Sequence, residues 1–156
     1  MAADFSAIRS LLWWGTCALT AVGLLCCGGE TVGTLDVQVD LATRDGTPMS
    51  CETFGAERIE VALYARDDDP LPMDRIGRAC AVSGAGRGLY ALRVATGHYA
   101  RVDVRFLSDG GNTLRMCTAQ GSAEAVLSVE DVTVPDPEST ALTVSVVADP
   151  GSCAAP

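Results

Sequence analysis

The chain contains no lysine and only one histidine. All of its 11 basic residues are arginine. Schiff-base catalysis and a P-loop both depend on a lysine, so neither is available to this protein. With His98 as the only imidazole, a metal site built from several histidines is excluded. We therefore expect neither a bound metal nor a cofactor.

A surplus of positive charge is also missing. The chain has 20 acidic residues against 11 basic ones, which gives a formal net charge of -9. A nucleic-acid-binding protein needs a basic face that neutralises phosphates, so we expect no nucleic-acid partner. The 156 residues, 48% of them hydrophobic, are enough for one core and too few for two ordinary domains.

An apolar run lies near the N-terminus, at residues 11–25 (LLWWGTCALTAVGLL). It is shorter than the roughly 20 residues that a membrane-spanning helix needs, and it fits the apolar part of an export signal. The run leads into Leu24-Leu25-Cys26-Cys27-Gly28, in which an apolar pair and a small residue precede a cysteine. This pattern resembles the lipobox of bacterial lipoproteins.

The lipobox resemblance implies that residues 1–27 are a lipoprotein signal helix ending in a lipidated cysteine. Cys27 is then the lipidation site, residues 28–33 are a short tether, and the acyl chains make the membrane the first partner. Gly28 and Gly29 follow the cysteine instead of an aspartate, which in such lipoproteins favours the outer membrane. The alternatives are an ordinary secretory signal, giving a secreted or periplasmic protein, and an uncleaved anchor.

Four cysteines remain after the expected anchor. An even number of cysteines in an exported chain indicates disulfides. A zinc site of four thiolates would need closely spaced cysteine pairs, and the sequence has none. Of the three possible pairings we favour the sequential one, because it requires least of the topology. The favoured bridges are Cys51–Cys80 and Cys117–Cys153.

Residues 34–156 alternate apolar and polar side chains in short segments separated by turn-forming residues. This period of two is typical of half-buried strands, and no helical stripe is evident after position 30. We predict one all-β domain, an antiparallel β-sandwich of about seven to eight strands, immunoglobulin-like or prealbumin-like. The alternating segments centre on residues 35–41, 59–63, 90–94, 102–106, 114–116, 125–129 and 142–146.

Residues 88–102 have the form GxYxLxVxxGxYxxV. The stretch resembles the paired strands of transthyretin-like and carboxypeptidase-regulatory-like β-sandwich domains. The resemblance implies that Gly97 turns the corner while Tyr90 and Tyr99 pack near a hairpin. The whole arrangement is also similar to small cysteine-bearing lipoproteins of Gram-negative bacteria. Both resemblances bear on the fold, whereas function depends on particular sites.

Few residues suggest catalysis. His98 follows Gly97 in a predicted turn, and no GxSxG motif presents a serine to it. The carboxylates of 67–69 and Asp74 lack the ligand spacing of an EF-hand loop and are interpreted as a solvated acidic loop. Residues 84–88 (GAGRG) lack the third spaced glycine and the helix of a phosphate-binding loop. We therefore assign no catalytic residue.

Arginines concentrate in the middle of the chain. Residues 75–115 carry seven arginines and two acidic residues, whereas the flanking segments 28–74 and 116–156 are acidic. Arg93, Arg101 and Arg105 alternate with apolar residues, which predicts a ladder of guanidinium groups on one outward sheet face. Such a face suits carboxylates and phosphates. The alternative is that Asp36, Asp40 and Glu60 on neighbouring strands pair with these arginines.

The sequence therefore predicts a membrane-anchored envelope lipoprotein that acts as a non-catalytic binding or structural module. Its partner would be an envelope protein or another anionic surface. One alternative is an accessory subunit of a surface or transport assembly. The other is a hydrolase that uses clustered carboxylates, which would require two of them to converge in a cleft.

Overall fold

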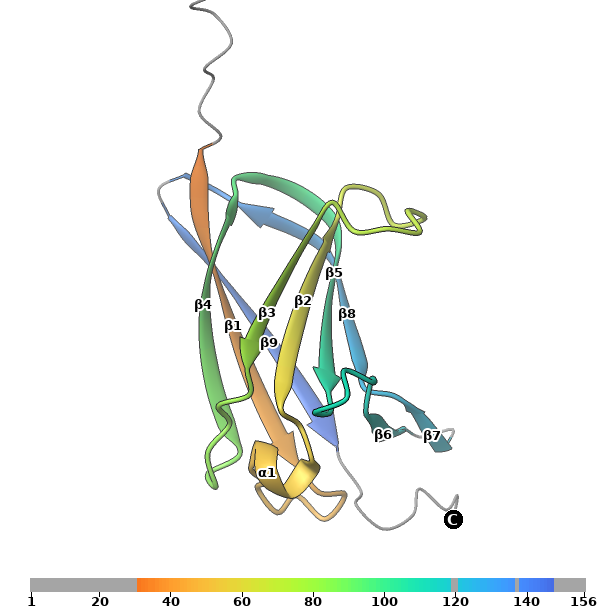
Figure 1. Ribbon diagram of the computed structural model, residues 1–156. Coiled ribbons are helices and arrows are strands. Elements are labelled where there is room, and N and C mark those ends of the chain that lie inside the picture. Colours follow the sequence, from red (N-terminus) through yellow and green to blue (C-terminus); the bar gives the residue numbers. More distant parts are fainter. Residues whose placement is uncertain (1–30, 119–120, 137, 148–156) are drawn as a thin grey trace, which may run out of the picture. The chain divides into compact units, whose positions relative to one another are not determined.

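The computed structural model describes residues 31–118, 121–136 and 138–147 (Figure 1). These residues form an all-β domain of three sheets, mostly antiparallel, and the predicted fold class is confirmed. The described residues hold nine strands and one short helix, compared with the seven to eight strands expected. The elements are β1 (Val32–Ala42), α1 (Cys51–Phe54), β2 (Arg58–Tyr64), β3 (Asp74–Ala79), β4 (Arg87–Ala95), β5 (Gly97–Leu107), β6 (Arg115–Thr118), β7 (Gly121–Glu124), β8 (Val126–Val134) and β9 (Ser139–Val147).

Sheet A has the strand order β4-β1-β9, with β1 in the centre. The alternation seen in the sequence is reproduced, because every second β1 residue from Leu35 to Leu41 is buried. β1 is antiparallel to β4 but parallel to β9. The parallel pair differs from the wholly antiparallel sandwich that we expected.

Sheet B has the order β3-β2-β5-β8, and all of its pairs are antiparallel. β3 was not predicted, because its sequence DRIGRA contains a single large apolar residue, Ile76, which is only partly buried. Such a composition suits an edge strand, which has one neighbour and little contact with the core. The short strands β6 and β7 form a separate two-stranded sheet.

The inner faces of sheets A and B share one hydrophobic core. Leu35, Val61, Leu92 and Phe106 are fully buried members of it, and they come from β1, β2, β4 and β5. The polar residues that alternate with them on β2 and β5 therefore lie on the outer face of sheet B. This arrangement follows from the strand period of two.

The chain passes between the two sheets at α1 and at the β3–β4 connection, and a disulfide joins these two crossings. α1 begins after Ser50, whose hydroxyl accepts a hydrogen bond from the Thr53 amide, and it ends at Gly55 in the left-handed region. The predicted bridge Cys51–Cys80 is present, with a Cα–Cα distance of 5.9 Å. Cys117 is also disulfide-bonded. Its predicted partner Cys153 lies outside the described residues, so that pairing stays a prediction.

The stretch at 88–102 forms a corner between sheets. β4 pairs with β1 in sheet A, whereas β5 pairs with β2 and β8 in sheet B, so the predicted hairpin between them is wrong. Gly97, at φ 153°, does turn the corner as expected. Tyr99 packs close by and donates a hydrogen bond to the Ala95 carbonyl at 2.6 Å.

The predicted signal segment 1–27, the lipidation site Cys27 and residues 28–30 of the predicted tether 28–33 lie outside the described residues. The last two tether positions, Val32 and Gly33, already belong to β1. Among the residues that are described, no helix is long and apolar enough to cross a membrane.

Candidate functional site on the outer face of sheet B

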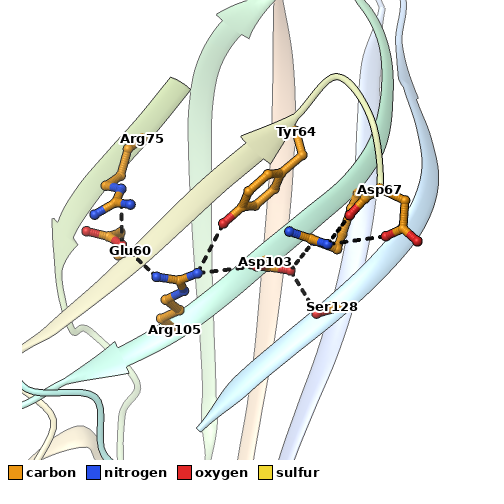
Figure 2. Close-up of polar contacts among 8 residues, drawn as sticks. Glu60, Tyr64, Asp67, Arg75, Asp103, Arg105 and Ser128 are labelled. Atoms are coloured by element: carbon orange, nitrogen blue, oxygen red, sulfur yellow. Dashed lines mark hydrogen bonds and ion pairs between the residues drawn. The ribbon is translucent and has the colours of Figure 1, made fainter. Parts of the chain in front are cut away.

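Eight residues form a connected polar cluster on the outer face of sheet B (Figure 2). Register brings them together, because Glu60, Ala62 and Tyr64 of β2 stand directly opposite Arg105, Asp103 and Arg101 of β5. Directly opposed side chains on neighbouring antiparallel strands lie within contact distance. We call this group the sheet B cluster; its members are Glu60, Tyr64, Asp67, Arg75, Arg101, Asp103, Arg105 and Ser128.

Asp103 lies at the centre of the cluster, and only 6% of its side chain is exposed. Its Oδ1 accepts a hydrogen bond from the Ser128 hydroxyl at 2.7 Å and lies 3.2 Å from Arg101 Nε. Its Oδ2 lies 3.4 Å from Arg105 Nη2. A buried carboxylate requires such partners, because removal of an unpaired charge from water is costly.

Arg101 contacts Tyr64 through its guanidinium face, and Asp67 and Asp103 through its nitrogen atoms. Its Cζ lies 4.0 Å from the centre of the Tyr64 ring, a cation–π geometry. Its Nη1 donates to the backbone carbonyl of Asp67 and lies 3.3 Å from the Asp67 carboxylate. Partial burial acts to lower the pKa of Arg101, but the contact with Tyr64 and the charge of Asp103 outweigh it. The pKa of Arg101 therefore lies above the ordinary value for arginine.

Arg105 connects Asp103 to Glu60 within the sheet B cluster. Its Nη2 donates a hydrogen bond to the Tyr64 hydroxyl at 3.1 Å, and its Nη1 lies 3.9 Å from Glu60 Oε1. Arg75 of β3 approaches the same Glu60 oxygen at 3.6 Å. Figure 2 shows Glu60 between these two guanidinium groups.

The charges of the cluster balance. Three arginines face three carboxylates, and each arginine has a carboxylate within 4 Å. Within the described part of the chain, the buried Nε atoms of Arg101 and Arg105 have no hydrogen-bond partner, although Arg101 Nε is close to Asp103. An anionic partner would therefore compete with Glu60, Asp67 and Asp103 for the same guanidinium groups.

The three arginines predicted as one docking ladder do not share a face. Arg101 and Arg105 lie together on β5 in sheet B, whereas Arg93 lies on β4 in sheet A, opposite Thr34. The local alternation correctly gave an outward position to each of them. The alternation could not show to which sheet each arginine belongs, because residues 95–97 carry the chain from one sheet to the other.

The remaining candidates have local partners. His98 is 56% exposed, with Nε2 3.6 Å from Asp131 Oδ1 and Nδ1 3.4 Å from the Thr133 hydroxyl. In the acidic loop, Asp68 pairs with Arg66 at 3.0 Å. Within the residues that the structure describes, no three metal-binding side chains are gathered around a common point. That no metal binds stays a prediction.

Sequence reasoning missed Tyr64 and Ser128 as members of the cluster. Tyr64 is 2% exposed although it lies on the outer face, because the Arg101 side chain covers its ring. Glu60 and Tyr64 are separated by an even number of positions on one strand, and this signal in the sequence places them on the same face. Nothing in the local sequence places Ser128 opposite Asp103, since that pairing joins β8 to β5.

A shallow hollow of about 310 Å³ lies at one end of sheet A, where β1 and β9 end and β4 begins, and no member of the sheet B cluster lines it. One carboxylate lines it, that of Asp40, which accepts a hydrogen bond from Arg87 Nε at 3.0 Å. Glycoside hydrolysis of the usual kind uses two carboxylates in one cleft. Neither this hollow nor the sheet B cluster presents two unpaired carboxylates within the described residues.

Comparison with models of known protein families, with curated proteins and with solved structures found no match. The resemblances to bacterial lipoproteins and to transthyretin-like domains therefore remain hypotheses, and the fold is established here at the level of an all-β domain.

Proposed function

We propose that this chain is a membrane-anchored envelope lipoprotein whose β-domain is a non-catalytic binding or structural module. The observation that carries the proposal is the Cys51–Cys80 bridge, because disulfides persist in oxidising, extracytoplasmic compartments. The lipobox pattern at Cys27 supports attachment to a membrane, by preference the outer one.

A non-catalytic role is supported by the way the polar residues are used. Glu60 and Asp103, the most buried carboxylates of the sheet B cluster, are both engaged by guanidinium groups. A general acid or base needs a carboxyl group that can reach substrate and exchange a proton. In this cluster the contacts of the same two carboxyl groups connect four neighbouring strands, β3, β2, β5 and β8.

The anchoring part of the proposal is tested by the intact mass of the chain recovered from membranes, with alkylation before and after reduction. We expect a chain that begins at Cys27, carries acyl groups and reveals four thiols only on reduction. Cys27→Ala is the control, and it should abolish acylation. A lipid-free chain that begins elsewhere would overturn the anchoring proposal and leave an exported protein.

The docking part of the proposal is tested by cross-linking and recovery of partners. Arg101→Ala with Arg105→Ala removes the two guanidinium groups that β5 contributes to the sheet B cluster, and Arg93→Ala is the matched control on sheet A. Circular dichroism must first show that both variants are folded. Loss of a partner in the double variant alone would support docking on sheet B, and unchanged recovery would contradict it.

A further inference from the structure

One end of the domain carries most of the large apolar side chains that are exposed. Among the described residues, five such side chains are exposed, and three of them belong to this end: Val32 at 42%, Leu71 at 75% and Met73 at 61%. The other two, Leu89 and Val147, lie on sheet A. Exposed apolar side chains that gather in one region mark surfaces that contact something other than water.

Strand register shows that Val32, Leu71 and Met73 lie at the same end of the domain. Val32 opens β1 and pairs with Ala95, the last residue of β4. β5 begins two residues later, and its neighbour β2 ends at Tyr64, just before the loop that holds Leu71. Met73 is held at the same level, because its amide donates to the Leu63 carbonyl at 2.8 Å. Figure 1 shows the start of β1 and the β2–β3 loop at the upper end of the domain.

This end is also the one that the chain enters from Cys27. Val32 lies five positions after Cys27, and a fully extended chain spans at most about 3.6 Å per residue, or roughly 18 Å in total. If Cys27 is acylated, the end that carries Leu71 is therefore held within a short distance of the bilayer surface.

We propose that the β2–β3 loop rests on the bilayer to which Cys27 is anchored, with Leu71 and Met73 inserted at the lipid interface. The proposal rests on the proposed lipid anchor. Exposed apolar residues beside a covalent lipid add to the membrane attachment and fix the orientation of the domain. The same loop carries three consecutive carboxylates, at 67–69, which would be repelled by anionic lipids. The occupant is therefore a zwitterionic lipid surface.

The test uses a photo-crosslinking amino acid placed at position 71 of the full-length chain in its native membrane. Position 89 is the matched control, because Leu89 is exposed to 70% but lies on β4 in sheet A. We expect lipid adducts from position 71 to exceed those from position 89 several-fold. Vesicles of zwitterionic lipid should reproduce this difference, and vesicles rich in anionic lipid should reduce it.

Two outcomes would overturn the proposal while the lipid anchor stands. They are protein adducts in place of lipid adducts at position 71, and equal lipid labelling at positions 71 and 89 in a chain whose mass shows acylation. A chain without acyl groups overturns both the anchor and the orientation, and the intact mass identifies this case before any crosslink is formed.

Discussion

Asp103 is a buried carboxylate that touches two guanidinium groups and a hydroxyl. Asp103→Ala leaves Arg101 and Arg105 without this partner, and breaking a buried ion pair in this way costs about 3–5 kcal/mol. We expect the free energy of unfolding, measured in urea with the disulfides intact, to fall by about 3 kcal/mol. Asp67→Ala, whose side chain is 68% exposed, is the control and should cost less than about 1 kcal/mol. Equal losses in both variants would contradict a central role for Asp103.

Tyr90 gives a prediction about alkaline pH. Burial raises the pKa of its phenol above the usual 10.0, although the hydrogen bond from the Ala81 amide acts in the opposite direction. A raised pKa in the folded state means that the unfolded chain loses its proton first as the pH rises. The contribution of Tyr90 to stability is therefore complete below pH 10 and is lost as the pH rises through the folded-state pKa.

Denaturation curves from pH 8 upward test this prediction about Tyr90. We expect the free energy of unfolding to decline above the ordinary phenol pKa, and Tyr90→Phe to remove part of that decline. Tyr64 and Tyr99 are present in both proteins, so the comparison isolates Tyr90. The same slope in both proteins would show that Tyr90 does not titrate differently in the folded state.

At the scale of single residues, the sequence predicted side-chain direction better than side-chain partners. Alternation along 101–106 correctly placed Arg101 and Arg105 on the face opposite Val102 and Val104. Their partners on β2 and β8 depend on which strands become neighbours and in what register. That choice is made by the packing of the whole core, so the local sequence does not contain it.

At the scale of elements, strong apolar alternation identified the three strands of sheet A, whereas the strand β3, which has weak alternation, was missed. β1, β4 and β9 bury every second residue and were predicted. The alternation on β8 changes phase, because Val132 and Val134 are buried whereas Leu127 and Val129 are only partly so. Asp131 lies between them in the left-handed region, at φ 61°. When the alternation changes phase inside one strand, no single period of two runs through its sequence, so the pattern does not reveal the whole strand.

The β3–β4 connection gives a prediction at the same scale. Gly86 and Gly46 have similar left-handed backbones, at φ 75° and 83°, but differ in the space around them. A Cβ at Gly86 would lie 2.6 Å from the Leu41 carbonyl oxygen, whereas one at Gly46 would meet nothing within 4 Å. We expect Gly46→Ala to cost about 1 kcal/mol through backbone strain alone. Gly86→Ala should cost at least about 2 kcal/mol, since the backbone must also move.

Thermal or urea denaturation of the two glycine variants separates strain from crowding. The prediction concerns the difference in the free energy of unfolding between the two variants, because the left-handed strain is common to both. If the two variants were equally stable, the close contact between Gly86 and Leu41 would have no energetic weight.

For the whole molecule, the fold class was predictable because short alternating segments between turns can bury their apolar faces only in stacked sheets. The parallel pairing of β1 with β9 was not predictable, since parallel and antiparallel edge strands have the same alternation. The interior of the domain is shared by both sheets, so we expect them to unfold together.

The Cys51–Cys80 bridge links two of the crossings between the sheets, α1 and the β3–β4 connection, and joins residues 29 positions apart. On the loop-entropy estimate, its removal by Cys51→Ala with Cys80→Ala should lower the free energy of unfolding by about 3–4 kcal/mol. Urea denaturation measures this loss. The wild-type chain, unfolded in the presence of reductant, shows the combined effect of losing all bridges and should be less stable than the double variant. A double variant as stable as wild type would show that core packing alone holds the crossings.

The pairing of β1 with β9 has a consequence for the order in which the domain is assembled. Each β1 residue from Thr34 to Ala42 pairs with a β9 residue 105 positions later, as Thr34 does with Ser139. A chain delivered N-terminus first presents β1 long before its parallel neighbour arrives, and an unpaired strand edge is a template for incorrect partners. Sheet A can be completed only when nearly the whole domain has emerged, so assembly is a late and non-local event. For the exported protein proposed above, sheet A would therefore be completed only after β9 has left the export channel.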